Sequence, residues 1–171
     1  MKWIVLFLSI FFLIVVQASF SSFLAPFSFA NLVLIFVVMV SIFGSTKEVT
    51  VVTVISALML DFSSGLTDGL LLTSFIATVF SIRLMVNWFF SKEEDIKVLL
   101  GSVFFGTVIF FLVTLLINQL FGIFNQAYVL DYYFLLTRKV WLDLFLNLVF
   151  TYPIMYYYFF VQKFTKTHAS V

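Results

Sequence analysis

Two aspartates, Asp61 and Asp68, have the residue type and spacing that could most directly do chemistry in this chain. They bracket a short polar segment, residues 61–69, that also contains Gly65 and Gly69. Two nearby carboxylates can bind a divalent cation or act as an acid/base pair. The serines and glycines between them are instead typical of a solvated turn, and the segment lacks the lysine of a phosphate-binding loop. The sequence therefore favours a turn over a metal-binding or catalytic pair.

A second polar pattern lies near the C-terminus, where Asp143, Asn147 and Thr151 recur at every fourth residue. This spacing places all three on one face of a helix. Pro153 follows, and because proline lacks an N–H we expect a kink about one turn earlier. In a membrane such a stripe is expected to face another helix, with interhelical hydrogen bonds worth on the order of 1 kcal/mol each. Contact with a ligand or a partner protein is the open alternative.

Arg83 is the third candidate, because it lies inside a long apolar stretch. It precedes Phe90 by seven residues, which is about 10 Å along a helix, and its long side chain could extend to the lipid headgroups. An ionisable residue within a membrane span is otherwise a functional hypothesis. Arg83 and Asp143 are predicted to lie towards opposite membrane surfaces, so a salt bridge between them is not expected.

Catalytic sets are missing from the rest of the sequence. The single histidine, His168, lies in the polar C-terminal tail, and the chain has no cysteine. No histidine or carboxylate cluster has the spacing of metal ligands, and no nucleophile and base are placed for mutual contact. The sequence predicts a protein that is not an enzyme and that holds no cofactor and no metal.

Composition indicates the surroundings of these residues. The chain is 64% hydrophobic, 21% aromatic and 10% charged over 171 residues, whereas a soluble domain is about 25% charged. Crossing a bilayer takes about 20 mostly apolar residues per helix, and apolar blocks of roughly that length repeat along the chain. The net charge is +1 and no long basic run is present, which argues against nucleic-acid binding. A polytopic integral membrane protein is the fold class that fits.

We predict an all-α protein whose 171 residues form one transmembrane domain, a single bundle of six helices. Apolar runs such as residues 108–113 do not alternate with polar residues, as the strands of a β-barrel would. A polar cytoplasmic tail is expected at 162–171. The predicted spans are 3–24, 26–43, 47–62, 69–90, 98–121 and 140–161.

Positive charges set the predicted orientation, because lysines and arginines near span ends favour the cytoplasmic side. With the N-terminus inside, the cytoplasmic side receives six lysines and the outer side receives two basic residues, Arg138 and Lys139. The six are Lys2, Lys47, Lys92, Lys97, Lys163 and Lys166. Both termini are thus predicted to be cytoplasmic and the turn at 61–69 to be external. Cleavage of the first span as a signal peptide, near Val16-Gln17-Ala18, would leave five spans.

The segment around the acidic turn resembles the rod shape-determining protein MreD family of bacteria. The resemblance rests on chain length, the six-span layout, Leu60-Asp61, Ser64-Gly65-Leu66 and Gly69-Leu70, with a weaker match at Asn147-Leu148 and Pro153. This sequence differs from that family in having Asp68, a high phenylalanine content and the acidic run Glu93-Glu94-Asp95.

The resemblance implies a non-enzymatic scaffold of the elongation machinery in the bacterial inner (cytoplasmic) membrane. Its implied neighbour is an MreC-like single-span membrane protein, which would connect it indirectly with MreB filaments inside and peptidoglycan synthases outside. In that reading Asp61, Gly65 and Gly69 shape the outer hairpin near a periplasmic partner. The alternative is a substrate-binding membrane subunit of an energy-coupling-factor type vitamin transporter, in which Arg83 and the Asp143 stripe would line a ligand cavity.

Overall fold

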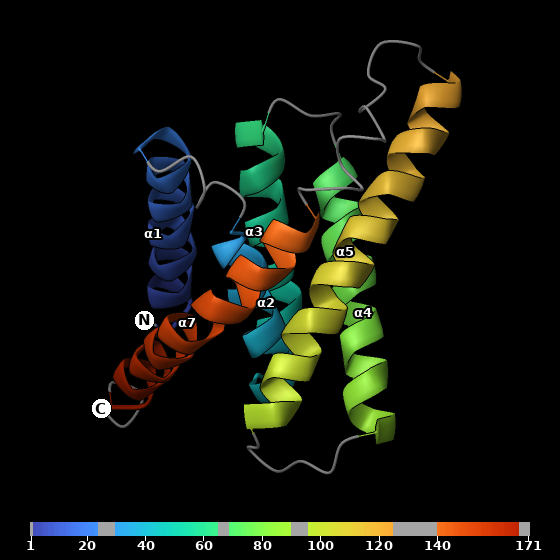
Figure 1. The fold of residues 1–171 in the computed structure, drawn as a ribbon. Helices are drawn as coiled ribbons and strands as arrows, with labels where there is room; N and C mark the ends of the chain where they lie inside the picture. Colours follow the sequence, from blue (N-terminus) through green and yellow to red (C-terminus); the bar gives the residue numbers. More distant parts are fainter. Residues whose placement is uncertain (1, 24–29, 65–68, 90–95, 125–139, 168–171) are drawn as a thin grey trace.

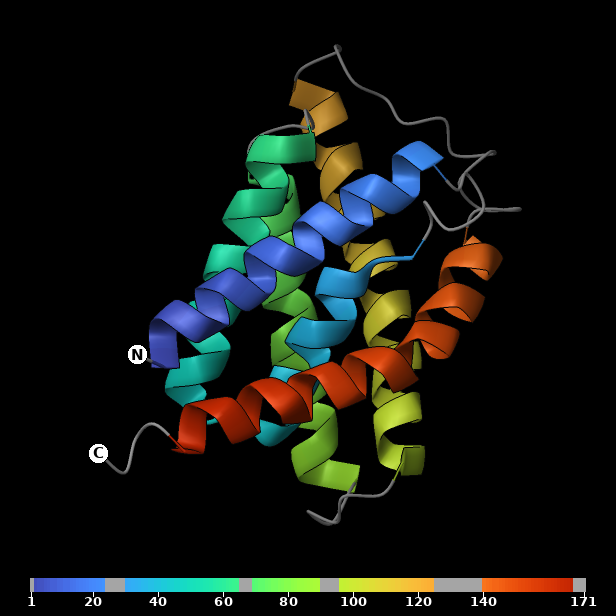
Figure 2. The same cartoon turned by 90° about the vertical axis from the view of Figure 1, so that its left-hand side faces the viewer.

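The computed structural model describes residues 2–23, 30–64, 69–89, 96–124 and 140–167, and these ranges form an all-α bundle (Figure 1). Consecutive helices run in opposite directions, so that α1 begins and α7 ends at the same end of the bundle (Figures 1 and 2). The helices are α1 (Lys2–Phe23), α2 (Leu32–Phe43), α3 (Thr46–Ser64), α4 (Leu70–Phe89), α5 (Ile96–Phe124) and α7 (Val140–Thr167).

Four of these helices are long and apolar enough to cross a membrane, as expected of a multi-pass membrane protein. Their apolar segments are Lys2–Ser19, Leu70–Trp88, Ile96–Leu120 and Val140–Phe164. Helix α2 is apolar but has 12 residues, about 18 Å of helix against a hydrocarbon core of about 30 Å. Helix α3 is long enough but carries Lys47, Glu48 and Asp61. The six predicted spans thus correspond to six described helices, of which four have the length and composition of a span.

At two predicted boundaries the described helices begin or end at other residues. The second span was expected at 26–43, but Ala30 and Asn31 precede the helix, which begins at Leu32 because the Asn31 side chain caps its first turn. The tail expected at 162–171 is helical as far as Thr167, since α7 continues beyond the apolar segment. Residues 24–29 and 168–171 lie outside the described ranges.

The short helix α2 is the centre of the bundle. Its residues from Leu32 to Ser41 are all buried, and it packs against each of the other five described helices. Helices α1 and α7 flank it on either side in Figure 2, with α3, α4 and α5 behind. A helix that is apolar around its whole circumference is expected to be surrounded by protein or lipid. Here the surroundings are the other helices.

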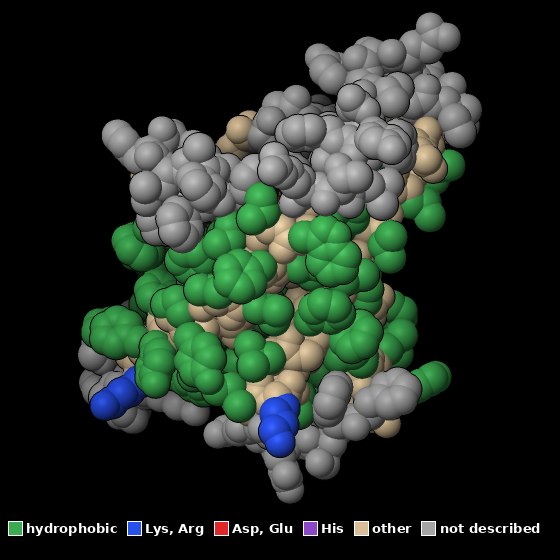
Figure 3. Space-filling model, in the orientation of Figure 1, with side chains coloured by type: hydrophobic (Ala, Val, Ile, Leu, Met, Phe, Trp, Pro, Cys, Tyr) green, Lys and Arg blue, Asp and Glu red, His purple; other side chains and the backbone are tan. Residues whose placement is uncertain are grey.

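The outer surface of the bundle is apolar where the described side chains form it. Figure 3 shows a band of hydrophobic side chains across the face seen in Figure 1, with the lysine and arginine side chains of that face at its lower edge. The large hydrophobic side chains exposed on the bundle include Phe80 and Phe145, which are 65% and 64% exposed. Such a band is the surface that a bilayer would cover.

Helices α2, α4 and α5 approach one another closely at Gly106 of α5. A Cβ atom added at Gly106 would lie 2.9 Å from Ile82 Cδ1 on α4 and 3.1 Å from Val38 Cγ2 on α2. Both neighbours are fully buried, so they have little room to move. On the same helix, a Cβ atom at Gly101 would meet nothing within 4 Å.

These two glycines provide a matched test of the packing around α2. We expect Gly106→Ala to lower the thermal unfolding temperature in detergent, because the added methyl group forces Ile82 and Val38 apart. Gly101→Ala should leave the temperature unchanged or raise it, since alanine favours a helix by about 1 kcal/mol over glycine. Adding Ile82→Val to Gly106→Ala should restore part of the loss. Equal effects of the two alanine substitutions would contradict the close approach at Gly106.

Candidate functional site

Polar side chains that form hydrogen bonds at helix ends make three clusters among the described residues. We call them the α2 cap, the α4 cap and the α2–α3 clasp. The α4 cap is formed by Asp61 alone. The α2 cap is formed by Gln17, Asn31, Thr107, Asn147 and Thr151. The clasp is formed by Lys2, Gly44, Ser45, Thr46, Glu48 and Arg83. These three clusters include four of the eight residues that the sequence singled out.

The α2 cap satisfies backbone N–H groups at the start of α2 with the side chain of Asn31, which precedes the helix, and with side chains of α1 and α7. The Asn31 side chain accepts a hydrogen bond from the Leu34 amide at 3.0 Å, and Gln17 Oε1 of α1 accepts one from the Val33 amide at 3.4 Å. Asn147 Oδ1 of α7 accepts one from the Asn31 amide at 2.8 Å. The first amides of a helix have no partner within the helix. Side chains of α1 and α7 supply partners here.

Asn147 also connects α7 to α5. Its Nδ2 donates to Thr107 Oγ1 at 3.0 Å, and the Thr107 hydroxyl donates in turn to the Val103 carbonyl at 2.8 Å. One turn after Asn147, the Thr151 hydroxyl donates to the Asn147 carbonyl at 2.7 Å. Asn147 and Thr151 are each 1% exposed. One amide side chain therefore joins α2, α5 and α7 inside the bundle.

The other members of the predicted stripe lie in different surroundings. Asp143 is half-buried in the first turn of α7, where a carboxylate is favoured by the helix dipole. Pro153 lies inside α7 on an exposed face. The axis of α7 changes direction in its middle (Figure 2), as expected of an internal proline.

The α4 cap consists of one carboxylate that holds the first turn of the next helix. Asp61 lies near the end of α3 and is 7% exposed. Its Oδ1 accepts from the Leu71 amide at 2.9 Å, and its Oδ2 accepts from the Leu72 amide at 3.1 Å. Gly69, which precedes α4, has a φ of +84°, a conformation that glycine adopts without strain. The sequence predicted a turn here but not that Asp61 caps α4.

The α2–α3 clasp occupies the end of the bundle where α1 begins. Ser45 and Glu48 form a capping box at the start of α3, in which the Ser45 amide donates to Glu48 Oε2 at 3.0 Å and the Glu48 amide donates to Ser45 Oγ at 3.4 Å. Lys2 Nζ of α1 forms an ion pair with Glu48 Oε1. The connection between α2 and α3 is thereby tied to the start of α1.

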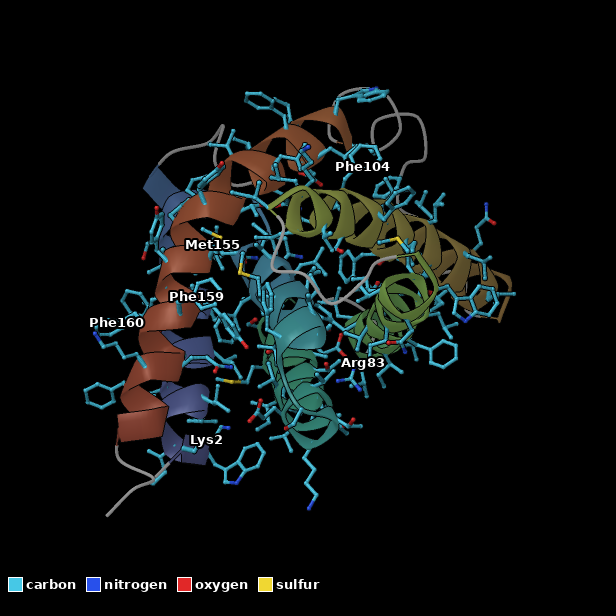
Figure 4. All side chains as sticks on the ribbon, turned by 90° about the horizontal axis from the view of Figure 1, so that it is seen from below. Lys2, Arg83, Phe104, Met155, Phe159 and Phe160 are labelled. Carbon is cyan, nitrogen blue, oxygen red and sulfur yellow. The ribbon has the colours of Figure 1, made fainter. Side chains whose placement is uncertain are left out.

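Arg83 belongs to the same cluster. It donates to Thr46 Oγ1 at 3.0 Å and to the Gly44 carbonyl at 3.2 Å. Gly44 is the C-cap of α2, and a cation at the C-terminus of a helix is favoured by the helix dipole. Figure 4 views the bundle from this end and shows Lys2 on α1 and Arg83 on α4. The sequence predicted a side chain that extends to the headgroups, whereas the structure directs it to the end of α2.

Several residues of these clusters were missed in the sequence. Asn31 before an apolar run and the Ser45-x-x-Glu48 spacing are both helix-start signals that could have been recognised. Gln17 and Thr107 carry no such signal, because their partners lie on other helices. Of the earlier candidates, Gly65 and Asp68 lie outside the described residues, as does His168.

The chemistry available to these clusters is hydrogen bonding to helix ends. Within the described ranges, no group of three or more His, Cys, Asp or Glu residues could hold a metal ion. Asp61, Arg83 and Asn147 each bond to a helix terminus or its flanking residue, and they come from three different helices. The arrangement fixes the positions of helices relative to one another.

Comparisons of the chain with protein-family models, with curated proteins and with solved structures find no match.

The α4 cap can be tested by removing its carboxylate. Asp61→Ala leaves the Leu71 and Leu72 amides without their acceptors, and we expect a loss of about 1–3 kcal/mol in the free energy of unfolding. Asp61→Asn retains one acceptor oxygen and should lose less. Thermal unfolding in detergent, followed by tryptophan fluorescence, measures the change. Phe62→Ala is the control, because the neighbouring Phe62 side chain is 84% exposed. An Asp61→Ala protein as stable as the Phe62→Ala protein would contradict the cap.

Proposed function

We propose that this chain is a non-enzymatic membrane scaffold of the bacterial cell-elongation machinery, similar to MreD. The observation that carries the proposal is the bond of Asp61 to the Leu71 and Leu72 amides. Asp61 and Gly69 belong to the segment on which the resemblance rests, and both have a structural role at the α3–α4 connection. A carboxylate committed to two backbone amides shapes a hairpin that a partner could bind, and it is poorly placed for acid/base chemistry.

The use of the other interior polar groups supports the same proposal. A transporter subunit requires several polar groups that converge on a ligand pocket. Arg83 and Asn147 instead bond to opposite ends of α2, and Thr151 bonds to the backbone of its own helix. Arg83 and Asn147 thereby hold helices together, which is the requirement of a scaffold that presents fixed surfaces to other membrane proteins.

The proposed topology has six crossings with both termini in the cytoplasm. The alternating directions of the six described helices support it (Figure 1). Lys2 and Lys47 lie at the end where α1 begins, in agreement with the positive-inside rule. The α3–α4 connection then faces the periplasm.

Cysteine labelling tests this topology, because the chain has no cysteine of its own. Ser63 near the end of α3 and Lys47 near its start are both exposed. In intact spheroplasts we expect Ser63→Cys to react with a membrane-impermeant maleimide, and Lys47→Cys to react after lysis alone. The reverse pattern would overturn the orientation. Labelling of both sites in intact spheroplasts would show that α3 does not cross the membrane.

The proposed partners are an MreC-like single-span membrane protein and, through it, MreB filaments and peptidoglycan synthases. Affinity purification of the tagged protein from its host in mild detergent, followed by mass spectrometry, tests the assignment. We expect an MreC-like chain and wall-synthesis enzymes to be enriched over an untagged control. Asp61→Ala should reduce their recovery and Phe62→Ala should not. Recovery of ATPase subunits with a transmembrane coupling subunit, together with saturable vitamin binding, would identify a transporter component instead.

A further inference from the structure

Helix α7 bends in its middle, where Pro153 lies, and its later part does not follow the bundle. We call residues 154–167 the distal segment. In Figure 2 the later part of α7 runs across the bundle, whereas α4 and α5 run along it. Figure 4, seen from below, agrees, because α4 is viewed nearly end-on and α7 along its length. Helices that cross a bilayer are tilted by about 20° on average, so the distal segment has the direction of a helix on a membrane surface.

The distal segment lies at the level where α2 ends. Phe43 is the last residue of α2, and the ring centroid of Phe43 lies 5.9 Å from that of Tyr158 and 5.6 Å from that of Phe159. One face of the segment is buried against the bundle, through Ile154, Tyr158 and Val161. This packing fixes the depth of the segment beside the α2–α3 clasp, at the end of the bundle where α1 begins (Figure 2).

The opposite face of the distal segment is exposed, aromatic and carries a lysine. Tyr156, Phe160 and Phe164 are 69%, 65% and 47% exposed, and Lys163 on the same face is exposed as well. Their intervals of three and four residues place them on one side of the helix. Aromatic rings are enriched at the level of lipid headgroups, and helices that lie in this interface combine them with lysines. The exposed face therefore has the composition of an interfacial helix.

Positive charge is concentrated in the chain segments that contain or adjoin the helix ends at this level. Residues 1–2, 44–48, 83–97 and 162–171 carry seven basic and four acidic residues, whereas the rest of the chain carries two basic and four acidic residues. Figure 3 shows lysine and arginine side chains at the lower edge of the apolar band. The cytoplasmic leaflet contains anionic lipids, which attract basic segments next to the membrane. The charge of this end thus complements anionic headgroups.

We propose that the distal segment lies along the inner surface of the membrane and binds anionic phospholipids there. Its exposed aromatic rings lie between the headgroups and the upper part of the acyl chains, and the Lys163 ammonium group extends to a lipid phosphate. The C-terminal end of α7 stays on the side where α1 begins, so the proposed topology is unchanged. This inference rests on the proposed orientation and does not depend on the scaffold role.

The depth of single spin labels tests the placement with the full-length protein, because the chain contains no cysteine. Labels at Tyr156→Cys, Phe160→Cys and Lys163→Cys are measured in nanodiscs of phosphatidylcholine and phosphatidylglycerol in equal parts. Collisions with oxygen and with a water-soluble nickel complex report the depth of each label. A helix along the membrane normal changes depth by about 10 Å over seven residues, and we expect less than half of this between Tyr156→Cys and Lys163→Cys. On α4, Phe80→Cys and Trp88→Cys are the control and should differ by about 12 Å.

The choice of lipid is tested with a fluorescent label at Phe160→Cys. We expect nitroxide-labelled phosphatidylglycerol to quench this label more strongly than nitroxide-labelled phosphatidylcholine, and the two lipids to quench a label at Phe80→Cys equally. Lys163→Gln should lower the preference at Phe160→Cys about fivefold, the factor expected for one lysine near an anionic surface. Lys97→Gln, which removes an exposed lysine at the start of α5, should leave the preference unchanged. Phe164→Cys replaces Phe160→Cys if that variant does not fold.

Three results would overturn the proposal. A depth change of about 10 Å between Tyr156→Cys and Lys163→Cys would show that the distal segment crosses the membrane. Access of the nickel complex to all three spin labels, as high as in water, would show that this face lies off the membrane and is open to a soluble protein. Equal quenching by the two lipids at Phe160→Cys, or a preference that Lys163→Gln leaves unchanged, would exclude recognition of anionic headgroups by this segment.

Discussion

The amide groups at the start of α2 impose the constraint on which the rest of the bundle depends. Helix α2 is 12 residues long, too short to reach from one surface of a bilayer to the other, so its first turn begins inside the bundle. Hydrocarbon cannot satisfy backbone amides, and Asn31, Gln17 and Asn147 do so instead. Because these acceptors come from α1 and α7 as well as from the segment before α2, the cap determines which helices surround it.

The opposite end of α2 is also held by a side chain from another helix. Arg83 donates to the carbonyl of Gly44, the residue that ends the helix. Glu48, in the first turn of α3, forms an ion pair with Lys2 of α1. Asp61 repeats the arrangement at the start of α4. In each case a polar side chain near the end of one helix, or in the middle of another, completes the hydrogen bonds of a neighbouring helix terminus. A rigid bundle results, and its outward faces remain available for lipid and other proteins.

The sequence predicts much of this fold and less of the polar clusters. Apolar block lengths were sufficient to place α1, α3, α4 and α5 within a few residues, and Pro153 marked the bend in α7. The start of α2 was misplaced because residues 26–30 are mostly apolar and continue the hydrophobic run, while the cap depends on the single side chain of Asn31. The spacing of Asn147 and Thr151 identified a helix face. It could not identify Thr107 or the Asn31 amide as partners, because the neighbours of a face depend on how the helices pack.

Amide hydrogen exchange of the protein in lipid nanodiscs tests the central claim most directly. If side chains seal the start of α2, the Val33 and Leu34 amides should exchange as slowly as the Val37 and Val38 amides in the middle of that helix. Asn147→Leu should then accelerate exchange at the Asn31 amide, which loses its acceptor. Rapid exchange of Val33 and Leu34 in the unaltered protein would show that the start of α2 is open to water, and it would contradict the role assigned to Gln17, Asn31 and Asn147.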